Sequence, residues 1–154
     1  MAVALKVNGL NKIMTLAERY PAISQKHIDK AIGVSINLIW ATSVSKSPIG
    51  ATGNLRRGWV KEFTPFYGRL SNTTSYASDV EYGTPPHYVS PAELEPWVKK
   101  KGLPPWLAKV ISRSIEKKGT KANPFFSDSI DYVSDAVDNE FTKALSEITS
   151  ELSK

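Results

Sequence analysis

The chain contains no cysteine, only two histidines and no long apolar run. Without cysteine, neither a disulfide framework nor a thiolate metal site can form. His27 and His87 alone cannot supply an ordinary zinc or iron site, because these metals rarely accept ligand sets made almost wholly of carboxylates. We therefore predict no metal and no cofactor. His27 lies beside an apolar stripe and is expected to be a surface or half-buried residue.

No stretch approaches the roughly 18–20 consecutive apolar residues that cross a bilayer, so no membrane partner is expected. The segment MAVALKVNGL at the start lacks the basic region and apolar core of a secretory signal. We expect the product to stay in the cytoplasm where it is made. The 154 residues, 41% hydrophobic and 23% charged, are typical of one globular domain covering 1–154.

The net charge of +5 is unevenly distributed along the chain. Residues 97–121 contain eight Lys or Arg and one acid, whereas residues 122–154 contain two Lys and seven acids. A basic block followed by an acidic segment suits self-association or a charged partner. Two solvated faces would explain the same pattern equally well, because runs of charge specify little by themselves.

Apolar residues at helical spacing predict helices over 10–19, 22–45 and 106–118, and a long closing helix from about 123 to 152. Pro91 at its start and Gly102 just after its end predict a short helix over 91–100. The first stripe consists of Leu10, Ile13, Met14 and Ala17. The second consists of Ile28, Ala31, Ile32, Ser35, Ile36, Ile39, Trp40 and Ser43. The closing stripe consists of Phe126, Ile130, Val133, Val137, Phe141, Leu145, Ile148 and Leu152.

A change of period from helical to two after Leu55 predicts two strands, Leu55–Phe66 and Gly68–Thr74, joined by a turn at Tyr67–Gly68. Tyr76–Glu81 fits either a third strand or a short helical turn. The expected fold class is α+β: long N-terminal and C-terminal helices packed on a small antiparallel sheet, with a short helical insertion at about 88–120.

Nothing in the sequence provides a plausible catalytic set, and we predict that the protein is not an enzyme. The nucleophile motif G-x-S-x-G is missing, and neither histidine has an implied acidic partner. Asp79 and Glu81 would share one face if their segment were a strand, as a metal-dependent nuclease would require. An edge strand or loop surface is the simpler interpretation, since no lysine follows Asp79 in a (D/E)-x-K arrangement.

Nucleic-acid binding is the stronger alternative. Tryptophans Trp97 and Trp106 are interleaved with cations, so that indoles could stack on bases while lysines neutralise phosphates. Trp106 falls on the apolar side of its helix with Val110, however, and we expect it to be a core residue. The candidate DNA contacts of this small basic module are Lys99, Lys100, Lys101, Lys117, Lys118 and Lys121.

Three separated segments are more specific: Pro48–Leu55 (PIGATGNL), Tyr76–Thr84 (YASDVEYGT) and Gly119–Phe126 (GTKANPFF). In this order they resemble the neck and tail-completion proteins of long-tailed bacteriophages and prophages, the class that includes lambda-type minor tail protein Z. That family shows T-G-x-L, then Y-A-x-x-V-E-x-G-T, then P-F before a long closing helix. The matching residues are Thr52, Gly53, Leu55, Tyr76, Ala77, Val80, Glu81, Gly83, Thr84, Pro124 and Phe125.

The resemblance implies a structural virion protein that acts in tail completion or head–tail joining. It implies a ring of identical subunits, hexameric like the tail, which contacts other neck or tail proteins near the packaged DNA and is monomeric in isolation. The loop Ile49–Asn54 and the following hairpin would reach neighbouring subunits. Glu81 is expected to pair with Arg56 or Arg57 of the same or a neighbouring subunit. The stretch between Thr84 and Pro124 is longer than in the family, which is the main departure from its pattern.

Overall fold

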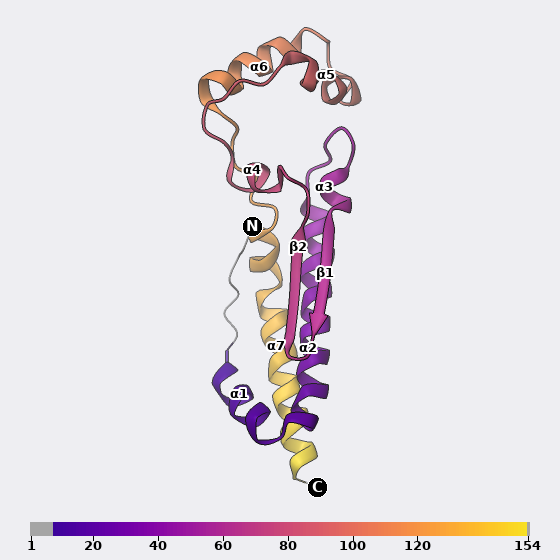
Figure 1. Ribbon diagram of the computed structural model, residues 1–154, viewed down its shortest axis with the longest axis vertical. Helices are drawn as coiled ribbons and strands as arrows, with labels where there is room; N and C mark the ends of the chain where they lie inside the picture. The colour runs from indigo at the N-terminus through magenta and orange to yellow at the C-terminus, as the bar shows by residue number, and fades with distance from the viewer. Residues whose placement is uncertain (1–7, 154) are drawn as a thin grey trace.

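Figure 1 shows the computed structural model, which describes residues 8–153 of the chain. The described part contains seven helices and a two-stranded sheet. The elements are α1 (Leu10–Arg19), α2 (Pro21–Lys46), α3 (Asn54–Arg57), β1 (Trp59–Thr64), β2 (Tyr67–Asn72), α4 (Ala77–Tyr82), α5 (Pro91–Lys100), α6 (Leu107–Lys118) and α7 (Ser127–Leu152). The predicted α+β class is confirmed. Most of the segment MAVALKVNGL and the side chain of Leu10 lie outside the described residues.

The long helices α2 and α7 pack side by side and form the shaft of the molecule (Figure 1). Each has 26 residues, which corresponds to about 39 Å at ~1.5 Å per residue. Lys46 at the end of α2 donates to the backbone carbonyl of Asp128 at the start of α7, so the two helices are antiparallel. No helix among residues 8–153 is both long and apolar enough to cross a membrane.

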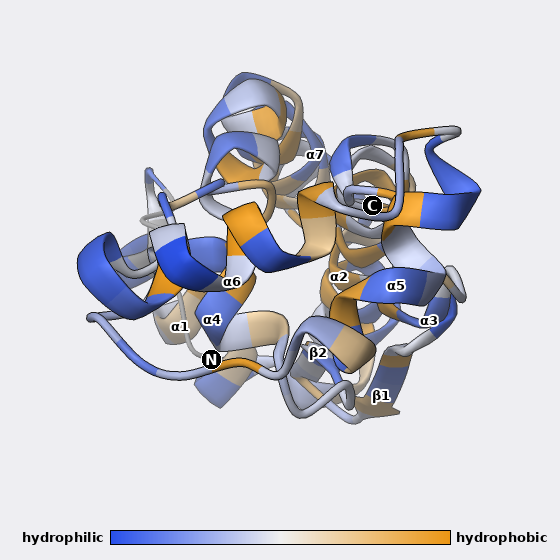
Figure 2. Cartoon of the chain, turned by 90° about the horizontal axis from the view of Figure 1, so that it is seen from above, coloured by the Kyte–Doolittle hydropathy of each residue, from blue (hydrophilic) through white to orange (hydrophobic). Residues whose placement is uncertain are grey.

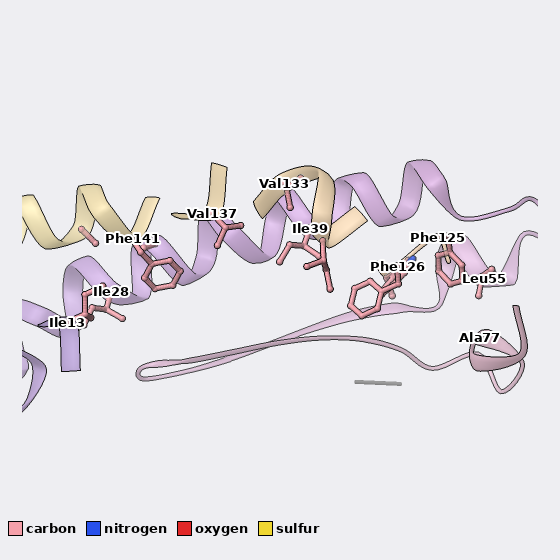
Figure 3. Close-up of a cluster of buried hydrophobic side chains, with 14 of the residues drawn as sticks. Ile13, Ile28, Ile39, Leu55, Ala77, Phe125, Phe126, Val133, Val137 and Phe141 are labelled. Atoms are coloured by element: carbon pink, nitrogen blue, oxygen red, sulfur yellow. The ribbon is translucent and has the colours of Figure 1, made fainter. Parts of the chain in front are cut away.

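The closing stripe and part of the second stripe face the contact between these helices, while Ile32 and Ile36 of the second stripe face the hairpin. Figure 3 shows buried side chains of α2 and α7 along the shaft, with Ile13 of α1 beside Ile28 at one end, and Leu55 of α3 and Phe125, which precedes α7, at the other. Burial of each large apolar side chain contributes about 1.5–3 kcal/mol, which makes this interface the main source of stability. The buried residues of the closing stripe are Phe126, Ile130, Val133, Val137, Phe141 and Ile148.

Strands β1 and β2 form an antiparallel hairpin that packs along α2. Trp59 pairs with Asn72 and Thr64 pairs with Tyr67, so the turn consists of Pro65 and Phe66. The predicted turn at Tyr67–Gly68 is therefore wrong by two residues, and both strands are shorter than predicted. The inner face meets α2, where Gly68 lies against Ile32, while the outer face is open to solvent.

Two further segments differ from the sequence-based expectation. Residues Asn54–Arg57 form the helical turn α3 rather than the start of a strand, since Gly53 with φ 72° redirects the chain before Leu55. The segment that could have been a strand or a helical turn is the helix α4. In α1, Met14 is exposed although it was expected on the apolar face, because α2 and α7 meet α1 at Ile13 and Leu16 instead.

The insertion projects from the body as a separate helical arm, in which α5 and α6 pack on each other at the top of Figure 1. Pro91 begins α5, where the Ser90 hydroxyl accepts the N–H of Ala92. Val98 of α5 and Ala108 of α6 are the buried apolar residues of these two packed helices. Lys100 donates to the backbone carbonyl of Ala51 at 2.8 Å, which links the arm to the loop before α3.

At the opposite end of the shaft, His27 joins α2 to the last turns of α7. Its Nδ1 lies 2.8 Å from a carboxylate oxygen of Glu147, and its Nε2 lies 2.7 Å from one of Glu151. Carboxylates only accept, so both contacts are hydrogen bonds when both ring nitrogens carry protons. The ring is buried, whereas the sequence predicted a surface or half-buried position. Lys26 and Lys30 flank the same two carboxylates.

The hydrogen bond from His27 holds the pKa of Glu147 and of Glu151 below the ordinary glutamate value. A carboxyl group with a lowered pKa stabilises the fold above its unfolded pKa of about 4.3, and this contribution is lost as the pH falls through the lower folded value. We predict that His27→Ala raises both pKa values towards the ordinary value and weakens the dependence of stability on acid. Carboxyl-resolved NMR titration measures both pKa values, and urea unfolding at a series of pH values measures the stability.

The matched control is Lys26→Ala, which removes an exposed cation next to Glu151 but leaves the imidazole in place. It should raise the pKa of Glu151 slightly and leave the pKa of Glu147 unchanged. Unchanged pKa values in the His27→Ala protein would show that the imidazole does not hold these two carboxylates.

Candidate functional site

The carboxylate of Glu81 lies where the second and third of the resemblance segments meet. Helix α4 presents it to the first turn of α7, and its side chain is only 1% exposed. One oxygen accepts the N–H of Phe126 at 2.9 Å, and the other accepts the N–H and the hydroxyl of Ser127. A helix N-terminus carries unpaired N–H groups and a partial positive charge, both of which a carboxylate satisfies. Glu81 therefore caps α7 from a distant part of the chain.

The expected pairing of Glu81 with an arginine is wrong. Arg56 instead donates to the backbone carbonyls of Ser47 and Ser45, and Arg57 donates to Thr52 and Asn54. Both arginines thus hold the loop that precedes α3. Because Glu81 is buried and already accepts three hydrogen bonds, an arginine of a neighbouring subunit has no access to it either.

The same two segments cross at the base of the arm. Thr84 and Thr120 form an antiparallel bridge, with N–H to O distances of 3.2 Å and 3.1 Å, and their hydroxyls lie 2.9 Å apart. Gly83 and Gly119 both have positive φ, and a Cβ at Gly83 would lie 2.5 Å from the carbonyl oxygen of Thr120. A Cβ at Gly119 would overlap the carbonyl oxygen of Thr84. Only glycine allows the two backbones to approach this closely.

The first segment joins this region through the core. Phe125 is 1% exposed and its ring meets that of Trp59 edge-on at 6.1 Å, while Phe126 lies 5.1 Å from the same indole. Leu55 and Ala77 belong to the same buried cluster (Figure 3). The three segments that carry the resemblance are therefore one connected unit, in which the capped start of α7 is packed against the hairpin and α3.

Most residues of these segments serve the fold, and only some reach solvent. The buried ones are Leu55, Ala77, Glu81 and Phe125. The half-buried ones are Gly53, Arg56, Val80, Gly83 and Thr84. The exposed ones are Thr52, Arg57, Tyr76 and Pro124. A direct role in binding a partner is thus restricted to the last group.

The residues considered for a nuclease are not brought together. Because α4 is a helix, Asp79 and Glu81 are separated by about 200° around its axis, at about 100° per residue. Asp79 is exposed, whereas Glu81 is occupied by the start of α7. Within residues 8–153 no group of three or more His, Asp or Glu side chains is placed to hold a metal ion.

The candidate DNA-contact lysines are exposed but lie in two separate places. Lys99, Lys100 and Lys101 are at the end of α5, while Lys117 and Lys118 are at the end of α6 and Lys121 follows it. A short linker, residues 102–106, joins the end of α5 to the start of α6. The length of α6, 12 residues or about 18 Å at ~1.5 Å per residue, therefore separates the two groups.

Trp106 is not a core residue, contrary to expectation. It is 63% exposed, and Val110, one turn further along α6, is 49% exposed. The apolar side of α6 that packs in the arm carries Leu107, Ala108 and Ile111 instead. Figure 2, a view from above, shows hydrophobic and hydrophilic segments alternating along α6.

Sequence reasoning also missed the tip of the hairpin. Phe66 adopts φ 59°, as the residue after proline does in a type II turn. Its N–H donates to the Asp29 carboxylate at 2.7 Å, which anchors the tip to α2. Phe63, Phe66 and Tyr67 are all exposed there. Pro65, which favours the second position of a turn, was the signal that could have located it.

We predict that Glu81→Ala destabilises the fold by about 3 kcal/mol or more, since it leaves buried N–H donors without partners. Glu81→Gln should lower the free energy of unfolding by less, because the amide oxygen still accepts a hydrogen bond from a backbone N–H at the start of α7. The matched control Asp79→Ala lies on the same helix but is exposed, and should change stability by less than about 0.5 kcal/mol. Urea unfolding measures all three. Equal stability of Glu81→Ala and Asp79→Ala would refute the capping role.

No family model, no curated protein and no solved structure matches this chain. Its function therefore has to be inferred from the side chains and contacts described above, together with the resemblance of the three segments.

Proposed function

We propose that this chain is a non-enzymatic structural protein of a tailed bacteriophage or prophage, located in the virion at the neck or the head-proximal end of the tail. It acts in tail completion or head–tail joining as one subunit of a ring. The resemblance of the three segments supports the phage assignment. Their convergence on the start of α7 gives these residues a shared physical role, which explains why such segments would occur together.

The observation that carries the proposal is the exposed aromatic tip of the hairpin. Phe63, Phe66 and Tyr67 are 50%, 40% and 49% exposed at the end of a two-residue turn. A bulky residue with positive φ costs about 1–2 kcal/mol, and glycine or asparagine would avoid that cost. Backbone strain with an exposed apolar side chain is typical of a contact made with another molecule. A hairpin of this kind suits a subunit that reaches its neighbour in an assembly.

The test is electron microscopy of a lysate in which the gene carries an early stop codon. Because the proposed subunit connects or finishes the tail, we expect full heads and tails that are unjoined, or tails of abnormal length. The wild-type gene supplied from a plasmid should restore normal particles. Normal infectious virions from the stop-codon phage would overturn the structural assignment.

Point variants supplied from the same plasmid test the hairpin tip. Phe66→Gly should keep folding stability within about 1 kcal/mol, since relief of the strain offsets the lost contacts of the ring. It should nevertheless fail to restore joined particles. Phe66→Tyr is the matched control, because it keeps an aromatic ring at the same position, and it should restore them.

A small DNA-binding module is the second candidate, favoured by the exposure of Trp106 beside Lys109. An indole can stack on a base while lysines contact phosphates. This function predicts a steep fall in affinity for DNA with rising salt, about 10³-fold or more between 50 and 200 mM for ~6 phosphate contacts. Titration of the purified protein with a labelled oligonucleotide measures it. Lack of binding at about 0.15 M ionic strength would remove this candidate.

A further inference from the structure

Helix α6 carries an exposed face that combines apolar and cationic side chains. We call it the cationic α6 face: Trp106, Lys109, Val110, Arg113 and Lys117. At about 100° per residue these five positions fall within an arc of about 100°, opposite the side that packs in the arm. The acid Glu116 lies at one edge of this arc. An indole, a valine and three cations thus share one exposed face, which suits an acidic partner that also offers an apolar group.

Helix α7 carries a complementary face near its start. We call it the acidic α7 face: Asp128, Asp131, Tyr132, Asp135 and Asn139, all of them exposed. Tyr132 is 76% exposed and is surrounded by the three aspartates. The residues have the same spacing as those of the cationic α6 face, so they also cover about 100° of the helix surface.

Neither face is used by the ion pairs within the chain. The ion pairs formed among the described residues involve Lys26, His27, Lys30 and Arg69, and none involves a residue of either face. Lys46 lies beside the acidic α7 face, where it donates to the backbone carbonyl of Asp128 and sits 5.1 Å from the Tyr132 ring. The three carboxylates of the acidic α7 face therefore remain available to a partner. The adjacent Asp138, which is not part of this face, accepts a hydrogen bond from Asn8.

We propose that the cationic α6 face of one copy of this chain docks on the acidic α7 face of a second copy. Both faces extend over twelve residues, or about 16 Å for the eleven steps of ~1.5 Å between the first and the last, so the two faces can pair along their whole length. The charges are opposite, and each face provides an aromatic ring that can be covered by the other. A single face pairing with itself would instead bring like charges together, which is unfavourable.

Such a contact uses two different patches on each copy, so every subunit can bind one neighbour on each side. Contacts of this type produce rings when the rotation closes and filaments when it does not. The inference therefore deepens the proposed ring-forming function and rests on it for its biological setting. It assigns the arm, which departs from the resembled family, to contact between subunits.

Engineered single cysteines can test the contact, because the chain has no cysteine of its own. Ser114→Cys places a thiol at the edge of the cationic α6 face, and Ala136→Cys places one at the edge of the acidic α7 face. Full-length chains with one change each are purified, mixed and oxidised, and the heterodimer is separated by a size tag on one partner. The control mixes Ser114→Cys with Glu62→Cys, an exposed position on the outer face of the hairpin.

We expect the Ser114→Cys and Ala136→Cys mixture to cross-link about tenfold faster than the control mixture, because charge complementarity favours the encounter. Adding Lys109→Glu and Arg113→Glu to the chain with Ser114→Cys should lower the rate of cross-linking to that of the control mixture. Adding Asp131→Lys and Asp135→Lys to the second chain should then restore it, since both charges are now reversed. All four positions are exposed, so these changes leave the fold intact.

Cross-linking no faster than the control would overturn the proposal, as would a failure of the doubly reversed pair to recover. Binding of a labelled DNA duplex by the wild-type chain, with cross-linking at the control level, would assign the cationic α6 face to nucleic acid instead. The experiment needs no phage, so its outcome is separate from that of the stop-codon lysate. A positive cross-link with normal virions would retain the contact and remove the tail role.

Discussion

The fold depends on one buried carboxylate. Glu81 connects the short helix α4 to the first N–H groups of α7, and α7 supplies one wall of the shaft along its whole length. A helix that starts in the protein interior needs a partner for its unpaired donors. Glu81 provides this partner from a segment 45 residues earlier in the chain. The position of α7 is thereby tied to the hairpin, to α3 and to both ends of the arm.

The molecule consists of a shaft, which contains the hydrophobic core, and of a hairpin tip and an arm that are exposed to solvent. The side chains that hold it together lie between α2, α7 and the hairpin, whereas exposed aromatic side chains include Phe66 at the hairpin tip, Trp106 on the arm and Tyr132 on the outer surface of α7. A subunit of an assembly benefits from this arrangement, because a stiff body keeps distant contact points at fixed separations. The strained turn at Phe66 and the two charged helix faces both fit this interpretation.

Long helices were predictable because their apolar stripes repeat over many turns, as those from Ile28 to Ser43 and from Ile130 to Leu152 do. Residues Asn54–Arg57 were misassigned because the period of two that marks the hairpin was extended back to Leu55. Leu55 and Trp59 lie four residues apart and are both buried, a spacing that suits a helical turn. Glu81 was assigned the wrong partner because backbone N–H groups leave no mark in a sequence, whereas arginines do. Trp106 was placed in the core because it shares an apolar side of its helix with Val110, but the arm has too few elements to cover both sides of α6.

The bridge between Thr84 and Thr120 affects how the sequence and length of the arm can change during evolution. The two ends of the arm are fastened to each other before the arm begins, so the body is closed without it. The entropic cost of a loop whose ends are already held together rises only slowly with its length. The arm can therefore be lengthened, shortened or exchanged with little effect on the shaft, which makes it the natural place for related proteins to acquire new binding partners while keeping one scaffold.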